Sequence, residues 1–161
     1  MKILPIFSAV LLSVALISAP VLGKGESKAA KTAPATLTNA QIIDQSISFD
    51  VPTRETVIDE KGQALTMFHY EIRNIGSKPI TSIQWISAYV AQQKILYSQN
   101  MQINLESPLE PGKSLNLNLK IPFAQIAEAN RAPFLNLQEK IEVYQLDRAI
   151  KLQGQGEIRE R

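Results

Sequence analysis

The chain has 161 residues, of which 45% are hydrophobic and 20% are charged. This length and composition fit one globular domain with short appendages, and they exclude an intrinsically disordered chain. Lys and Arg total 17 against 15 Asp and Glu, and the resulting charge of +2 is too small for a nucleic-acid-binding surface. The sequence has no cysteine, which excludes disulfides, thiolate metal sites and the acylated cysteine of a lipoprotein.

Residues 1–23 have the pattern of a secretory signal peptide. Lys2 precedes an uncharged apolar run that Pro20 interrupts, and small or aliphatic residues end at Gly23. We therefore expect an exported protein, periplasmic or secreted, with cleavage after Gly23. An uncleaved membrane anchor is the alternative, because residues 3–23 carry no charge and are just long enough to cross a bilayer.

The next segment, residues 24–40, is rich in Ala, Lys, Thr, Gly and Pro and contains almost no large apolar side chain. Such a composition cannot bury enough surface to offset the entropy of ordering, so we expect a flexible linker. The pattern of a folded domain covers residues 41–157, and residues 158–161 are left as a C-terminal tail. The sequence therefore predicts one domain on a tether.

Residues 41–157 are dominated by the period-two alternation of β-strands. The strand-like segments are 46–51, 55–58, 64–74, 80–90, 94–98, 101–107, 115–121 and 139–146, the last with a continuation past Asp147 left open. The segment 80–90 is apolar on both faces and is expected to be central. One short helix is expected within Ala124–Asn130. The pattern predicts an all-β, antiparallel, Ig-like β-sandwich of about seven or eight strands, with a small barrel as the alternative.

Residues 112–114 read Gly-Lys-Ser, which closes the phosphate-binding loop of many nucleotide hydrolases. That loop needs a glycine five residues before Gly112, where this chain has Ser107, and it must open a helix. Here an alternating strand, 115–121, follows instead. We therefore expect no nucleotide site but a type II turn, with Pro111 and Gly112 as its central residues.

The candidate catalytic and ligand-binding side chains are few. His69, the only histidine, alternates with apolar residues in the segment 64–74 and is expected to face solvent. One histidine without cysteine leaves no transition-metal set and no firm catalytic triad. Asp59 and Glu60 are neighbours in a turn and cannot flank a substrate as glycoside hydrolysis requires.

Two pairs of side chains keep alternative interpretations. Trp85 and Tyr89 lie on one face of a central strand, where core packing is expected and a ligand platform is the alternative. Asn116 and Asn118 face away from the leucines of 115–121, either as a solvated face or as a contact with another protein. No catalytic, metal-binding or cofactor-binding residue is predicted.

The part of the chain from about residue 66 to 121 resembles bacterial secreted Ig-like domains of the FxLYD type. The residues that carry the resemblance are turn residues: Asn74, Gly76, Lys78, Pro79, Ile80, Pro111, Gly112 and Ser114. The eponymous motif is not matched, because residues 86–90 occupy its place and only Tyr89 agrees. The resemblance implies an Ig-like fold in an exported protein, and it implies no catalytic residue because those families largely lack an assigned activity.

These observations predict a non-enzymatic binding or accessory module of the bacterial cell envelope. Its expected partner is another envelope or secreted protein, without nucleotide, nucleic acid or cofactor, and with membrane contact only if the signal segment stays uncleaved. A small hydrolase or carbohydrate-active enzyme that uses Asp or Glu is the first alternative, and a pocket with two carboxylates would favour it. A secreted inhibitor or chaperone is the second, and a long, uncharged, exposed edge strand would favour it.

Overall fold

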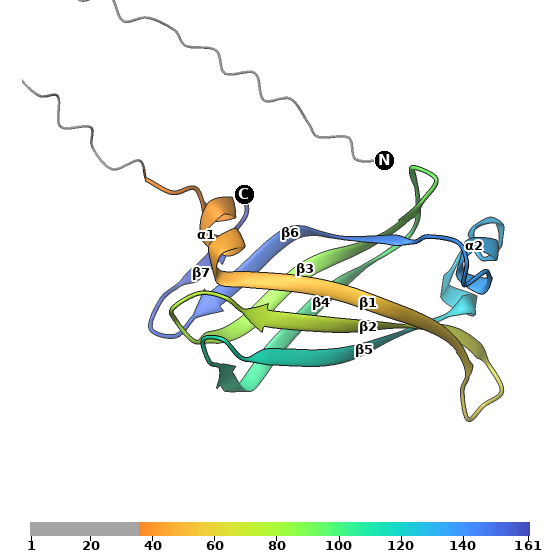
Figure 1. Ribbon diagram of the computed structural model, residues 1–161, viewed down its shortest axis with the longest axis horizontal. Coiled ribbons are helices and arrows are strands. Elements are labelled where there is room, and N and C mark those ends of the chain that lie inside the picture. Colours follow the sequence, from red (N-terminus) through yellow and green to blue (C-terminus); the bar gives the residue numbers. More distant parts are fainter. Residues whose placement is uncertain (1–35) are drawn as a thin grey trace, which may run out of the picture. The chain divides into compact units, whose positions relative to one another are not determined.

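The computed structural model describes residues 36–161, which form two packed antiparallel sheets (Figure 1). The first sheet has the order β1-β2-β5 and contains β1 (Ile47–Ile58), β2 (Ala64–Asn74) and β5 (Ser114–Pro122). The second has the order β4-β3-β6-β7 and contains β3 (Ile80–Ala91), β4 (Lys94–Leu109), β6 (Glu142–Leu152) and β7 (Glu157–Arg159). The predicted all-β antiparallel sandwich is confirmed.

The described residues begin inside the segment expected to be a linker. The predicted signal peptide, 1–23, and the part of the linker before residue 36 lie outside the described residues. An unpredicted helix, α1 (Asn39–Ser46), precedes β1. Its start is a capping box in which the Gln41 backbone N–H donates to the Thr38 hydroxyl, and the Thr38 N–H donates to the Gln41 side chain.

Two long strands each contain two segments that the sequence pattern predicts as separate strands. β1 unites the segments 46–51 and 55–58 across Pro52, with a register shift between Asp50 and Thr53. Proline is tolerated there because β1 is an outer strand, and one side of its backbone has no ladder to complete. β4 unites 94–98 and 101–107 in one strand of 16 residues.

The C-terminal part of the chain is more regular than the sequence predicts. β6 continues past Asp147, which adopts a positive φ of 49° at an irregularity in the ladder. β7, which the sequence does not predict, pairs with β6 through residues 157–159. The last strand of the second sheet is therefore short and lies close to the end of the chain.

The segment between β5 and β6 closes one end of the sandwich. It contains two 3-10 turns, Phe123–Gln125 and Glu128–Asn130, followed by the short helix α2 (Ala132–Leu135). Arg54 on β1 fixes this segment by donating hydrogen bonds to three backbone carbonyls, those of Pro133, Asn136 and Glu139. The helical turn expected within 124–130 is thus present as 3-10 structure, and the α-helix follows it.

The turn before β5 has the predicted geometry. Gly112 has a φ of 77°, and the Lys113 N–H donates to the Glu110 carbonyl at 3.0 Å. Pro111 and Gly112 are therefore the central residues of a turn that needs a positive φ at its third position. Ser114 then begins a strand and not a helix, which removes the geometry that phosphate binding requires.

The core lies between the sheets and is rich in aromatic side chains. Trp85 and Tyr89 are only 2% and 0% exposed, which confirms core packing and excludes a ligand platform. The Trp85 indole N–H donates to the Ser87 hydroxyl at 2.7 Å, and the Tyr70 hydroxyl lies 3.1 Å from that of Tyr89. Burial raises the pKa of both tyrosines, so these hydroxyls stay neutral and join the two sheets through hydrogen bonds.

Candidate functional site

His69 lies on the outer face of the first sheet, as the alternation of β2 predicts. Its side chain is 33% exposed, with Nε2 3.2 Å from the Glu55 carboxylate and Nδ1 2.8 Å from the Asn118 amide oxygen. Among residues 36–161 no hydroxyl makes a hydrogen bond to this imidazole. The contacts of His69 therefore contain no nucleophile that the imidazole would activate.

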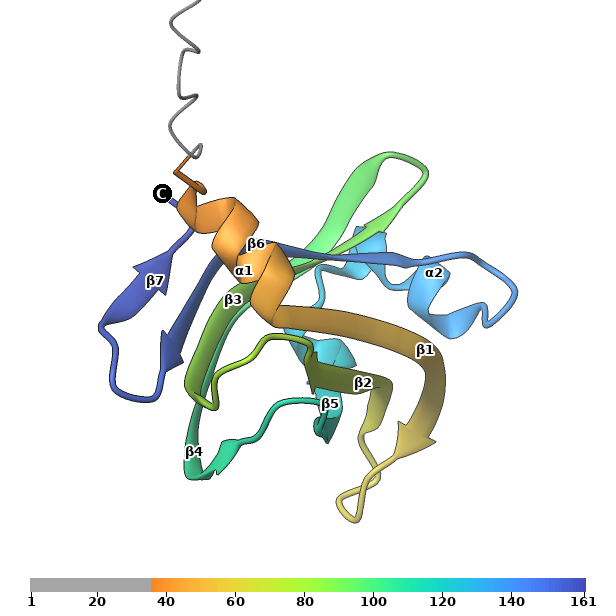
Figure 2. The ribbon, with the colours of Figure 1, turned by 60° about the vertical axis from the view of Figure 1, so that its left-hand side comes forward.

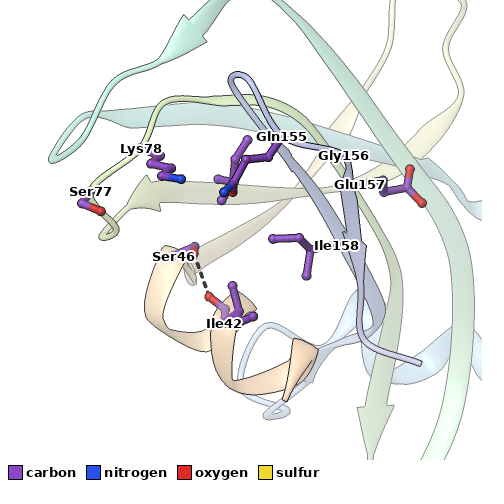
Figure 3. A pocket seen from close by; sticks show the side chains of 9 residues that line it. Ile42, Ser46, Ser77, Lys78, Gln155, Gly156, Glu157 and Ile158 are labelled. Atoms are coloured by element: carbon purple, nitrogen blue, oxygen red, sulfur yellow. Dashed lines mark hydrogen bonds between the residues drawn. The ribbon is translucent and has the colours of Figure 1, made fainter. Parts of the chain in front are cut away.

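A groove of about 610 Å³ lies between α1, the turn that links β2 to β3, and the hairpin of β6 and β7 (Figure 3). Ile42 and Ile158 supply apolar surface, and Lys78 is its cation. Glu157 also lines the groove, but its carboxylate points away from the other side chains in the view of Figure 3. The groove has no second carboxylate and no histidine among the described residues, so it offers no acid–base pair.

A second groove, of about 440 Å³, contains two carboxylates, Glu139 and Glu142. The carboxylate of Glu142 accepts hydrogen bonds from Lys140 Nζ and the Tyr144 hydroxyl, each at 2.7 Å. These bonds lower the pKa of Glu142, with Lys140 the larger cause. A glycosidase pair needs one protonated and one ionised carboxyl, and these contacts suit Glu142 only to the ionised role.

Within residues 36–161 no group of three or more His, Cys, Asp or Glu side chains is placed to hold a metal ion. In the same part of the chain, no helix is long and apolar enough to cross a membrane. What distinguishes the surface is the arrangement of its sheet edges.

One side of the sandwich has protected edges, formed by β1 and β7. β1 carries Pro52, a register shift and three charged residues, Asp50, Arg54 and Glu55. β7 is only three residues long and lies against α1, whose Asn39 side chain donates to the Arg159 carbonyl at 2.8 Å (Figure 2). Short length, proline, irregular register and charge are the features by which proteins prevent strand addition.

The other side has stretches of edge that lack these features, although β4 carries register shifts towards both ends, and Lys94, Glu106 and Pro108 lie outside its central stretch. β4 is the outer strand of the second sheet, and it pairs only with β3 among the described strands. The 3-10 segment covers its start, where the Asn130 side chain donates to the Leu96 carbonyl at 2.9 Å. From Ser98 to Leu105 the strand carries no charge and no proline, and its pairing with β3 is regular from Ser98 to Asn104. It is the long, uncharged edge that would favour recognition by strand addition.

The side chains of this stretch alternate strictly. The exposed outer row is polar and uncharged and consists of Ser98, Asn100, Gln102 and Asn104. The inner row is partly buried, and its apolar members Met101, Ile103 and Leu105 pack against the core. β5 repeats the pattern in the first sheet, with Leu115, Leu117 and Leu119 partly buried and Asn116 and Asn118 exposed.

β4 and β5 are joined directly by the turn at Glu110–Lys113, and the end of β4 emerges beside β5 at the lower edge of Figure 1. We call Ser98–Leu105 of β4 and Leu115–Leu119 of β5 the open side. The sequence left the two asparagines of β5 as either a solvated face or a contact with another protein. It did not identify β4, because pairing on one side only is a property of the sheet order and not of the local pattern.

Several residues of the family resemblance are connected by the hydrogen bonds of Asn74. The buried Asn74 side chain donates to the carbonyls of Lys78 and Leu109, and it accepts from the Gly76 N–H. The Asn74 carbonyl also accepts from the Gly112 N–H at 2.8 Å. These residues therefore connect two turns and hold the strands that form the open side, which is a structural role.

Comparisons of the chain with protein-family models, curated proteins and solved structures found no match. The geometry of the open side is therefore the basis on which a function is proposed.

Proposed function

We propose that this protein is an exported, non-enzymatic binding module of the bacterial cell envelope, built on an Ig-like sandwich. A constant-type immunoglobulin domain has strands A, B, E and D in one sheet and strands C, F and G in the other. Taken in chain order, β1-β2-β5 correspond to A, B and E, and β3-β6-β7 correspond to C, F and G. β4, which follows β3 in the chain where strand D would come, lies beside β3 instead. The buried Trp85 on β3 also matches the buried tryptophan of strand C. Export rests on the signal-peptide pattern of residues 1–23.

The observation that carries the binding role is the open side. A long, uncharged edge exposes unpaired backbone N–H and C=O groups, which other chains recognise by adding a strand. The apolar row beneath the β4 edge would supply pockets for alternate side chains of the added strand. Because the opposite side is protected, partner binding is directed to β4 and β5.

Two of the expected functions, an accessory binding module and an inhibitor or chaperone that presents a sheet edge, would both use this surface. The hydrolase hypothesis gains no support. In the groove of Glu139 and Glu142, the contacts of Glu142 suit it only to the ionised role of a pair. Asp59 and Glu60, which line a further groove, are neighbours in one turn. The proposed partner is a protein with an available β-strand.

Capture from envelope extract tests this function. The exported protein carries an affinity tag, and the extract comes from cells of the source bacterium that lack the gene. Ile103→Lys places a charge in the partly buried row of β4, and a lysine there can extend its ammonium to solvent. Thr56→Lys on the protected β1 edge is the matched control.

We expect the unaltered protein and Thr56→Lys to recover the same envelope protein, and Ile103→Lys to recover at most about a tenth of it. Thermal unfolding of each variant separates lost binding from lost folding. Recovery at background level with the unaltered protein, together with no affinity for peptidoglycan or lipid, would contradict the proposed function.

A further inference from the structure

We propose that the open side joins two copies of this chain, through antiparallel pairing of one β4 strand with the β4 strand of the second copy. This inference rests on the proposed function, because it uses the same binding surface and names what that surface fits. A different envelope protein would then bind by displacing the second copy.

The first argument is that both sheets are open on the same side. Apolar side chains are only partly buried on β4, at Met101, Ile103 and Leu105, and on β5, at Leu115, Leu117 and Leu119. A single added strand extends one sheet and leaves the other row in water. A second sandwich brings two layers, so its own β4 and β5 rows cover both rows of the first copy. Burial of both rows adds hydrophobic stabilisation in proportion to the apolar area removed from water.

The second argument is self-complementarity. A two-fold axis pairs residue i of one copy with residue j of the other, and the same pairing holds in reverse. An axis at Met101 or Gln102, near the middle of Ser98–Leu105, pairs odd-numbered residues with odd-numbered residues. The partly buried row of each copy then continues into the partly buried row of the other, and the polar rows meet on the outer face.

The third argument is electrostatic. No residue from Ser98 to Leu105 is charged, so the pairing brings no like charges together. Glu106 follows this stretch at one end, and the antiparallel arrangement places the Glu106 residues of the two copies at opposite ends of the interface. Like charges directly opposite each other across a strand pair are destabilising, and this edge avoids them. The paired stretch of eight residues is about 26 Å long, which is ample for a strand pair.

The test introduces a charge at Gln102, an exposed residue of the outer row that lies at or beside the expected axis. The exported protein, Gln102→Lys, Gln102→Glu and the control Thr56→Lys are each measured by light scattering and by sedimentation over a range of concentrations. We expect the unaltered protein and Thr56→Lys to show twice the monomer mass. Each Gln102 variant should raise the dissociation constant at least about tenfold, because two like charges meet near the axis.

The decisive measurement is an equimolar mixture of Gln102→Lys with Gln102→Glu. Only an interface in which residue 102 lies near its own symmetry mate restores the dimer in the mixture, because the mixed pair brings opposite charges together. Ile103→Lys gives a second, independent disruption through the inner row. Far-ultraviolet circular dichroism of each variant verifies the fold.

The outcomes separate this inference from the proposed function. A monomer at all concentrations, with an envelope protein captured in an Ile103-dependent way, would overturn the dimer and leave the binding role standing. A dimer that neither Gln102 variant weakens would overturn the β4 interface. A β4-dependent dimer that captures no envelope protein would support the dimer and contradict the wider binding role.

Discussion

The two sides of the sandwich differ in how their strand edges are treated. On the side of β1 and β7, α1 and the chain end are held by side chains. Arg148 forms ion pairs with Asp44 of α1 at 2.8 Å and with Glu160 at 2.7 Å. On the side of β4 and β5, no residue from Ser98 to Leu105 is charged, and the apolar rows remain partly exposed.

This difference between the strand edges points to the open side as the place for a binding surface within residues 36–161. Protection of a strand edge requires charged residues, proline or additional elements at defined positions in the sequence. The uncharged, proline-free stretches Ser98–Leu105 and Leu115–Leu119 on the other side support the proposed interaction surface there.

The largest effect is expected at Asn74, which connects the two turns beside the open side. Asn74→Ala removes three side-chain hydrogen bonds, those to Lys78 and Leu109 and that from Gly76, and leaves buried backbone groups without partners. The loss in unfolding free energy should be about 3 kcal/mol, measured by urea denaturation. Asn118→Ala, at an exposed position of β5, is the control and should cost less than about 0.5 kcal/mol.

A substitution at Gly76 tests the contact between the turn that links β2 to β3 and α1. A Cβ atom at residue 76 would lie 3.0 Å from the Ser46 Cα, which is backbone at the end of α1 and cannot rotate away. Gly76→Ala should therefore destabilise the domain by about 2 kcal/mol. Gly156→Ala adds the same atom where nothing lies within 4 Å and should change stability by less than about 0.5 kcal/mol. Equal midpoints for the two variants would contradict the close contact.

The ion pairs of Arg148 on the protected side should make stability depend on pH. The hydrogen bonds of Arg148 are the largest cause of the lowered pKa of Glu160. Because the folded pKa lies below the unfolded value, this contribution is complete above the unfolded pKa, near pH 4.3, and is lost as pH falls through the folded pKa. Arg148→Met should cost about 1 kcal/mol at pH 7 and progressively less below pH 4. A loss that stays constant between pH 7 and pH 3 would show that packing and not charge is responsible.

Much of the fold follows from the sequence because strands with one buried face have a clear pattern. The alternation of β2, with Phe68 and Tyr70 inside and His69 outside, predicts the observed burial. The same holds for β5 and for the turn at Pro111–Gly112. In these places local chemistry and tertiary structure agree, so the residues alone are sufficient.

The parts that could not be predicted depend on distant contacts. α1 is eight residues long with only two large apolar side chains, Ile42 and Ile43, and it is held by β7 and Arg148 from the far end of the chain. β1 crosses Pro52 because it is an edge strand, which the segment itself does not reveal. For the same reason the uncharged stretch Ser98–Leu105 becomes informative only when β4 is known to be an outer strand.

The smallest effect is expected at His69, on the flat outer face between the two sides. Its contacts with Glu55 and Asn118 are solvent-exposed, and exposed pairs of this kind contribute little. His69→Gln should change the unfolding free energy by less than about 0.5 kcal/mol, and it should leave both dimer mass and partner capture at the level of the unaltered protein. Normal stability with lost capture would place the binding surface on the outer face of β2, and it would contradict the assignment of binding to the open side.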